Sequence, residues 1–268
     1  MIFDTHSHYD DERYEEDREE LIKSLREKNV GAVTNICASY RSLTDVRLLT
    51  EKYDFIYGAV GLHPEGIDEL IKMGETAKSR SEVLDEMREL LINNDKIVAV
   101  GEIGLDYHYE EPPRDIQKIW FEEQMCLAEE LKKPVVIHSR DACEDTMDIL
   151  RAHPDVTGVM HCYSYAKETA VELLNMGYVI GVGGVVTFKN SKKLKETVEF
   201  LPLDKIVLET DCPYLAPEPF RGSRNDSSLI SYVIETVANI KGLDKETVEK
   251  ACWDNACRLY GLNIQEKI

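Results

Sequence analysis

The chain alternates short apolar runs with helical segments, and this alternation restricts its fold more than any other feature. Eight runs have the length and the β-branched content of strands. They start at Ile2, Val30, Phe55, Lys96, Pro134, Val156, Tyr178 and Lys205. Strands that alternate with helices favour a parallel sheet, and eight such units in about 210 residues favour a closed (β/α)8 TIM barrel over an open doubly wound sheet.

The segments between these runs have the periodicity and the ends of helices. Ser79-Arg80-Ser81-Glu82 fits a capping box, and Pro112-Pro113 begins a helix that extends to about Lys132. Other helices are expected at about 13–28, 42–52, within a longer region up to Asn93, and at 141–152, 167–176, 192–200, 227–241 and 245–260. No linker, repeat or low-complexity tract interrupts the chain, so we expect a single domain over residues 1–268 with extra C-terminal helices.

Composition excludes several classes of protein. A formal net charge of −19 opposes broad attraction to nucleic acid, so an anionic substrate would need local contacts. The 7 cysteines are odd in number and form no Cys-x-x-Cys pair, which argues against a disulfide framework and a thiolate zinc site. No Gly-x-Gly-x-x-Gly follows the first run, and no long apolar stretch or signal-like start is present. We expect a cytoplasmic protein that does not bind membranes.

Two histidines stand two positions apart near the start of the chain, after the first apolar run. Residues i and i+2 of a strand point to the same face, so His6 and His8 can approach one ion together. Such a pair is an incomplete metal site, because a divalent ion takes four or more ligands. Two surface histidines near a terminus are the alternative interpretation.

Further candidate ligands fall where later strands are expected to end. They are Glu102, His138, His161 and Asp211. Because (β/α)8 barrels build their active sites at the C-terminal ends of the strands, we expect all six candidates to converge there. Imidazoles with one or two carboxylates suit zinc, manganese, iron or nickel better than an all-oxygen cage, although magnesium stays among the candidates. The number of ligands indicates two ions.

Four residues have expected roles beyond simple ligation. Glu102 is the natural bridge between two ions, since one carboxylate can give an oxygen to each. Asp211 could both bind an ion and act as general base toward water that the ion has acidified. His63 could contact a leaving group or a phosphate oxygen, and Glu209 could support the ligands from outside. A salt-bridged Glu102, a turn-capping Asp211 and a buried structural His63 are the alternatives.

Cationic side chains near the expected strand ends could bind an anionic substrate. Forked guanidinium groups suit phosphate oxygens, and the candidates are Arg140, Arg221 and Arg224. A basic patch after the seventh strand would fit either a polyanion track or a soluble helix face, and consists of Lys189, Lys192, Lys193 and Lys195. His108 and His153 are expected at the surface.

Six stretches in order along the chain form a specific combined pattern. They are Asp4-Thr5-His6-Ser7-His8, Gly61-Leu62-His63-Pro64, Gly101-Glu102-Ile103-Gly104-Leu105-Asp106-Tyr107, Pro134-Val135-Val136-Ile137-His138-Ser139-Arg140, His161-Cys162-Tyr163-Ser164 and Glu209-Thr210-Asp211-Cys212-Pro213-Tyr214-Leu215-Ala216-Pro217. Together they resemble the TatD family of metal-dependent deoxyribonucleases, amidohydrolase-like barrels, and residues 255–262 resemble the family's closing helix. The resemblance implies the same six metal ligands, and it favours His63 as a substrate contact. The sequence departs from the usual family pattern at Ser7, at Tyr165 and at residues 226–228, but none of these departures removes a metal ligand.

These observations lead to one functional hypothesis and two alternatives. We expect a two-metal hydrolase that cleaves the phosphodiester bonds of DNA, an exonuclease acting on single-stranded or end-bound DNA being one form of it. An amide, ester or lactone hydrolase, such as an aminoacyl-tRNA deacylase, is the first alternative, since the same activated water attacks a carbonyl. A barrel that binds metal or a partner without catalysis is the second. The sequence leaves the oligomeric state open.

Overall fold

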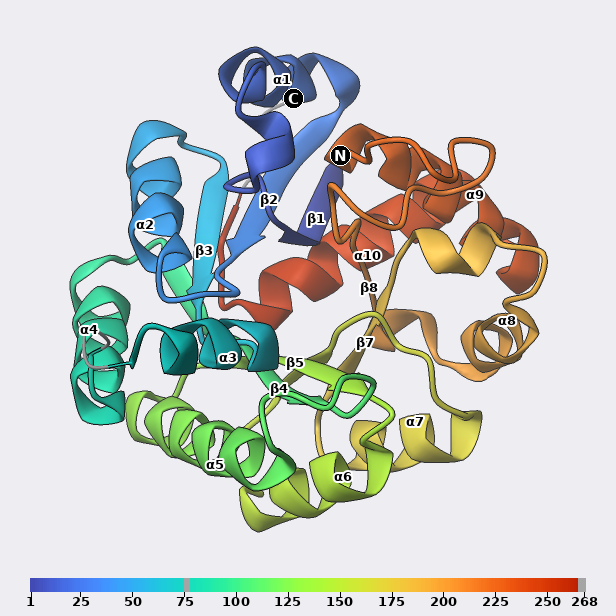
Figure 1. Ribbon diagram of the computed structural model, residues 1–268. Coiled ribbons are helices and arrows are strands. Elements are labelled where there is room, and N and C mark those ends of the chain that lie inside the picture. The colour runs from blue at the N-terminus through green and yellow to red at the C-terminus, as the bar shows by residue number, and fades with distance from the viewer. Residues whose placement is uncertain (75–77, 265–268) are drawn as a thin grey trace. The chain divides into compact units, whose positions relative to one another are not determined.

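Figure 1 shows the computed structural model, which describes residues 1–74 and 78–264. The strands of these residues form an eight-stranded sheet in the order β1 to β8. Each strand pair with a defined register is parallel. The predicted (β/α)8 fold class is therefore confirmed. By its internal contacts the chain divides into two compact units, Met1–Asn35 with His161–Ile268, and Ile36–Met160. The prediction of one domain over residues 1–268 stays a prediction.

The first unit contains both chain-terminal portions of the sheet. Its strands are β1 (Ile2–Ser7), β2 (Val30–Ile36, whose last residue belongs to the second unit), β7 (Val179–Val182) and β8 (Ile206–Leu208). Its helices are α1 (Arg18–Leu25), α7 (Lys167–Asn175), α8 (Lys192–Phe200), α9 (Ile230–Lys241) and α10 (Lys245–Leu259). A parallel bridge between Ser7 and Cys212 places the end of β1 beside the segment that follows β8.

The C-terminal helix α10 holds β1 and β8 in place, as Figure 1 shows. The Trp253 ring packs 5.7 Å from the ring of Phe3, and the Tyr260 hydroxyl donates a 2.8 Å hydrogen bond to the Thr5 carbonyl. The Asn255 amide donates to the carbonyls of Leu203 and Ile206. Burying aromatic rings of this size stabilises a fold by roughly 2–3 kcal/mol each. The extra C-terminal helices thus anchor two strands of the sheet.

The second unit contains the middle of the chain. Its strands are β3 (Ile56–Val60), β4 (Ile97–Asp106), β5 (Val135–Arg140) and β6 (Gly158–Met160). Its helices are α2 (Ser42–Lys52), α3 (Pro64–Lys72), α4 (Arg80–Asn93), α5 (Arg114–Leu131) and α6 (Cys143–Ala152). The capping box predicted at the start of α4 is present. The helical region expected up to Asn93 consists of α3 and α4, and its residues 75–77 lie outside the described residues.

Several predicted elements differ from the structure; the helix expected over 227–241, for example, is a 3-10 turn (Ser227–Leu229) followed by α9. The helix expected over 13–28 is wrong as one element, because it is divided into a 3-10 turn (Glu12–Tyr14), α1 and a second 3-10 turn (Arg26–Lys28). The division has a tertiary cause: the fully buried Tyr14 donates its hydroxyl to the distant Asn225 carbonyl. Strand β4 continues six residues past the expected end at Val100, because the buried Gln117 amide pairs with both backbone groups of Asp106. None of the described helices could cross a bilayer.

Candidate metal centre

The six predicted ligands fall into two groups, one in each unit. The first unit holds what we call the His6 cluster, which consists of His6, His8, His161 and Asp211. The second unit holds the His138 cluster, which consists of His63, Glu102, Asp106 and His138. Each contains side chains able to hold a metal ion. That the six ligands form one centre stays a prediction, as do the number and the identity of the ions.

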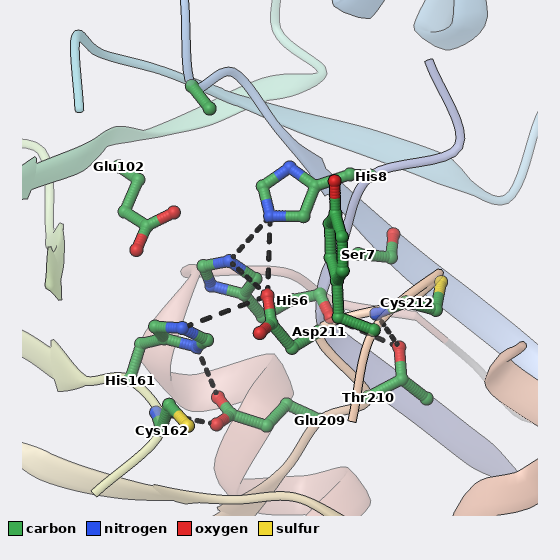
Figure 2. Close-up of polar contacts among 12 residues, drawn as sticks. His6, Ser7, His8, Glu102, His161, Cys162, Glu209, Thr210, Asp211 and Cys212 are labelled. Atoms are coloured by element: carbon green, nitrogen blue, oxygen red, sulfur yellow. Dashed lines mark hydrogen bonds and ion pairs between the residues drawn. The ribbon is translucent and has the colours of Figure 1, made fainter. Parts of the chain in front are cut away.

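Strand β1 presents the two histidines of the His-x-His motif side by side. His6 lies within β1 and His8 directly after it, where its N–H donates a 2.8 Å hydrogen bond to the Cys212 carbonyl. Their Nε2 atoms are 3.1 Å apart (Figure 2). His6 is only 1% exposed, so the alternative of two surface histidines is wrong for this residue.

One carboxylate oxygen faces all three imidazoles of the His6 cluster. Asp211 Oδ1 lies 3.4 Å from His8 Nε2 and 3.7 Å from His6 Nε2. It lies 3.9 Å from His161 Nε2, and Figure 2 shows these groups pointing toward one another. Four ligand atoms placed tetrahedrally about 2.1 Å from an ion are about 3.4 Å from each other. Three of these donors, those of His6, His161 and Asp211, lie within 4.8 Å of one another, so one divalent ion can take all three as ligands.

The backbone and the electrostatics of Asp211 both suit a metal ligand. Its φ of 59° lies in the left-handed region, which aspartate tolerates better than most residues, and its N–H donates to the His6 carbonyl at 2.9 Å. Burial acts to raise the pKa of this carboxyl. The hydrogen bond with His8 and the charges of His161, His6 and His8 outweigh burial and hold the pKa below its usual value. Asp211 therefore stays ionised at neutral pH.

Glu209 supports the His6 cluster from behind. Its Oε2 lies 3.2 Å from Nδ1 of His161, and its Oε1 accepts a 2.7 Å hydrogen bond from the Cys162 N–H (Figure 2). Glu209 is 1% exposed, so these contacts form without competing water. A carboxylate on the far nitrogen of a ligand histidine fixes the orientation of the ring and makes it a better donor. This geometry fits the supporting role expected from the sequence.

A second supporting carboxylate, Asp4, was missed by the sequence reasoning. Its oxygens accept hydrogen bonds from the hydroxyls of Thr210 and Ser227, both at 2.6 Å, and from the N–H groups of Thr210 and His6. Burial raises the pKa of Asp4 to about 7, although these hydrogen bonds act to lower it. The signal was present, because Asp4, His6 and His8 alternate along one strand face.

In the His138 cluster, one imidazole lies between two carboxylates. His138 Nδ1 is 2.9 Å from Glu102 Oε1, and its Nε2 is 3.1 Å from Asp106 Oδ2. Glu102 lies inside β4 rather than at its end, so the predicted position at a strand end is wrong for this residue. Because β4 continues, Asp106 shares the face of Glu102. The sequence reasoning missed Asp106 because it ended the strand at Val100.

Glycine between the two carboxylates lets β4 and β5 approach each other. Gly104 has φ of 145°, and a Cβ placed on it would lie 1.9 Å from the His138 carbonyl oxygen. Only glycine fits there. Burial acts to raise the pKa of Asp106, but the hydrogen bonds with His138 and with the His108 N–H, together with nearby histidine charge, hold that pKa below its usual value.

His63 belongs to the His138 cluster by distance but is suited to a different role. It caps the N-terminus of α3, where its Nδ1 accepts a 3.1 Å hydrogen bond from the Glu65 N–H. A neutral imidazole that accepts through Nδ1 carries its proton on Nε2. The ring lies edge-on to His138, with centroids 4.2 Å apart. His63 thus offers an Nε2–H donor, which suits an anionic oxygen better than a metal ion.

The three candidate arginines differ in their surroundings. Arg224 donates to both oxygens of Asp17, at 2.8 and 2.5 Å, so its guanidinium is already engaged. Arg221 lies 4.3 Å above the Phe188 ring, and Arg140 lies 5.5 Å from the Tyr109 ring centroid. Their roles in substrate binding stay predictions.

The two remaining histidines were both expected at the surface. His108 is exposed and lies 3.2 Å from Asp141, so the prediction is confirmed for this residue. His153 is buried, and the prediction is wrong there. Its ring sits against helix α5, with Nδ1 3.1 Å from Glu129 and Nε2 3.3 Å from Glu122. The two carboxylates, about two turns apart on α5, compensate the buried imidazole.

Comparison with known proteins identifies the family. A family model described as "TatD related DNase" matches residues 3–261. The chain is 41% identical to the uncharacterized metal-dependent hydrolase YabD of Bacillus subtilis, over 98% of this chain and 100% of that one. It is 31% identical to the uncharacterized metal-dependent hydrolase YcfH of Escherichia coli K12, over 98% and 97%. The crystal structure of YJJV, a TatD homolog of E. coli K12, superposes with a TM-score of 0.89 at 28% identity over 98% of each chain. The chain therefore belongs to the TatD-related family of metal-dependent hydrolases.

Proposed function

We propose that this protein is a deoxyribonuclease that hydrolyses phosphodiester bonds with two divalent ions, one held by each cluster. The spacing of the donor atoms of His6, His161 and Asp211, which all lie within 4.8 Å of one another, carries the proposal. The family description, which names DNA hydrolysis, supports DNA as the substrate.

Residues of the His6 cluster provide the means to activate water. A divalent ion bound there supplies Lewis-acid chemistry: it acidifies water and neutralises charge on a phosphodiester. Asp211, kept ionised by the histidines around it, takes the proton from the attacking water. Glu209 holds His161 in one orientation, so that the donor set is preorganised before substrate binds.

Residues of the second unit provide a hydrogen-bond donor for the substrate and ligands for an ion. The Nε2–H of His63 donates a hydrogen bond to an oxygen of the scissile phosphate or of the leaving group. The contacts of His138 with Glu102 and Asp106 hold its imidazole ready to bind an ion. The bridging role of Glu102 follows from its carboxylate chemistry and stays part of the proposal.

Purified protein, stripped with a chelator and reloaded with zinc, manganese or magnesium, tests this proposal. Its substrates are a single-stranded oligonucleotide, the matching duplex, and a panel of small esters and lactones. We expect nucleotide release that depends on the ion, and roughly two bound ions per chain by metal analysis. Ester turnover without nucleotide release would favour the amide or ester hydrolase alternative. Absence of stoichiometric divalent binding would overturn the metal centre altogether.

A further inference from the structure

A group of cations lies outside both clusters, on two loops of the first unit. We call it the Lys189 patch, and it consists of Lys189, Lys192, Lys193 and Arg221. The first three follow the 3-10 turn Gly184–Thr187 after β7, and Arg221 belongs to the loop after β8. All four side chains are exposed. They stand out in a chain with a net charge of −19.

The two loops are attached to each other, so the patch has a defined arrangement. The Arg221 guanidinium lies 4.3 Å above the ring of Phe188, the residue before Lys189. The Glu218 N–H donates a 2.8 Å hydrogen bond to the Thr187 hydroxyl. A Cβ on Gly184 would lie 2.1 Å from the Leu215 carbonyl, which shows how closely the two loops approach.

The positive charge of the patch is largely uncompensated. Within residues 1–74 and 78–264, no carboxylate forms an ion pair with Lys189, Lys193 or Arg221. Lys192 has one distant partner, Glu196, at 3.8 Å. Arg224, in the same loop as Arg221, is instead bound by Asp17.

The lysines also occupy a position that does not favour the fold. Helix α8 begins at Lys192, and its first turn contains three lysines and no acidic residue. Cations at a helix N-terminus oppose the helix dipole and destabilise the helix. Lysines that weaken their own helix and pair with few carboxylates are better explained by an anionic partner than by folding.

The loop that contains Arg221 starts at the His6 cluster. Asp211 begins it, and the Tyr214 N–H donates to the Asp211 carbonyl at 2.9 Å. Tyr214 and Phe220 expose 41% and 38% of their surface along this loop, and exposed aromatic rings are platforms on which unpaired bases stack. The same loop therefore carries Asp211 at one end, two aromatic rings along it, and Arg221 of the patch toward its other end.

We infer that the Lys189 patch binds phosphates of the DNA strand beyond the scissile one. This inference rests on the proposed function, because it takes the substrate to be a phosphodiester chain with one phosphate at the metal centre. Phosphate contacts of this kind strengthen binding of long strands and make it depend on salt. They also reconcile a strongly acidic protein with a polyanionic substrate.

The test compares two double variants that each remove two positive charges. Lys189→Gln/Lys193→Gln changes the patch, whereas Lys245→Gln/Lys250→Gln changes α10, where both lysines pair with carboxylates. Binding of fluorescein-labelled phosphorothioate oligothymidylate, which resists cleavage, is measured by anisotropy on the metal-loaded proteins over a range of salt. Strands of about 4 and about 16 nucleotides bracket the length of a binding groove.

We expect the patch variant to bind the longer strand roughly five- to tenfold more weakly, with a salt slope lower by about 0.7 for each lysine removed. The α10 variant should keep the wild-type slope. The patch variant should melt no lower than wild type, because it loses two cations that oppose the dipole of α8. An unchanged slope, or an equal fall in both variants, would overturn the inference.

Hydrolysis of bis(4-nitrophenyl) phosphate separates failure of this inference from failure of the proposed function. This small diester has a single phosphate and so offers the patch no second phosphate, and the patch variant should hydrolyse it within about twofold of wild type. No hydrolysis of any diester by wild type would overturn the proposed function. An unchanged salt slope with diester hydrolysis intact would overturn the Lys189 patch alone.

Discussion

The two clusters combine imidazole and carboxylate side chains in different proportions. In the His6 cluster, three imidazoles surround one carboxylate oxygen, that of Asp211. In the His138 cluster, one imidazole lies between the carboxylates of Glu102 and Asp106. Nitrogen-rich sites favour zinc-like ions, and oxygen-rich sites accept harder ions such as manganese or magnesium. Under the proposed function the two ions can therefore differ, and an ion in the His6 cluster should be retained longer against a chelator.

The largest expected effect comes from Asp211→Asn, which removes the carboxylate shared by three imidazoles. Asparagine tolerates the left-handed backbone found there, so the fold should persist. We expect kcat on a phosphodiester to fall by about a thousandfold or more, with loss of the ion of the His6 cluster. The control is Asp254→Asn on α10. A rate within about tenfold of wild type would remove Asp211 from the chemistry.

Glu209→Gln should produce a smaller loss in the same cluster. The amide can still accept from the Cys162 N–H, but it no longer offers negative charge to Nδ1 of His161. We expect metal affinity or kcat to fall by roughly 10- to 100-fold, measured by competition with a chromophoric chelator and by diester hydrolysis. Metal affinity and kcat at wild-type levels would show that His161 is oriented without the negative charge of Glu209.

Asp106→Asn addresses the other cluster, and we expect a loss of about tenfold in activity. Glu102 remains beside His138, so the imidazole keeps one of its two carboxylates. The ion of the His6 cluster should be retained, and metal analysis after partial chelation measures this directly. Asp141→Asn, at the exposed His108, is the matched control. Loss of both ions together would contradict the separation of the clusters.

The smallest effect is expected from Arg224→Gln. Its partner Asp17 and Arg224 itself are both well exposed, so the free energy of unfolding should change by less than about 1 kcal/mol. KM for an oligonucleotide should stay within about twofold of wild type, whereas Arg221→Gln should raise it. A large rise in KM for Arg224→Gln would mean that the arginine leaves Asp17 to bind the substrate, and would extend anion binding beyond the Lys189 patch.

Much of the fold could be predicted because each strand and helix carries its own local signal. Helices α2 and α8 begin and end at the predicted residues, and the strand order follows from the alternation itself. The His-x-His motif was interpretable because a strand has a period of two, which the 3.1 Å separation of His6 and His8 reflects.

The parts that could not be predicted depend on contacts between distant residues. Pairing with β5 and the contacts of Gln117 extend β4 to Asp106, which brings a further carboxylate to His138. His63 caps helix α3 and its tautomer is set by the Glu65 N–H, a contact that depends on the orientation of the ring and that the sequence does not specify. Tyr14 is held by Asn225, and so it divides a segment with the composition of a helix.

The hydrogen bonds of Asp4 with Thr210 and Ser227 also determine when the His6 cluster can form. On the ribosome, His6 and His8 are made early, and Asp211 follows about 200 residues later, an interval of roughly 10–40 s at 5–20 residues per second. Throughout that interval the Asp4 carboxylate lacks the hydrogen bonds from the Thr210 and Ser227 hydroxyls, and the two histidines lack the carboxylate of Asp211. The donor set of this cluster is therefore completed late in biosynthesis, and a chain arrested before β8 would leave the ribosome without it.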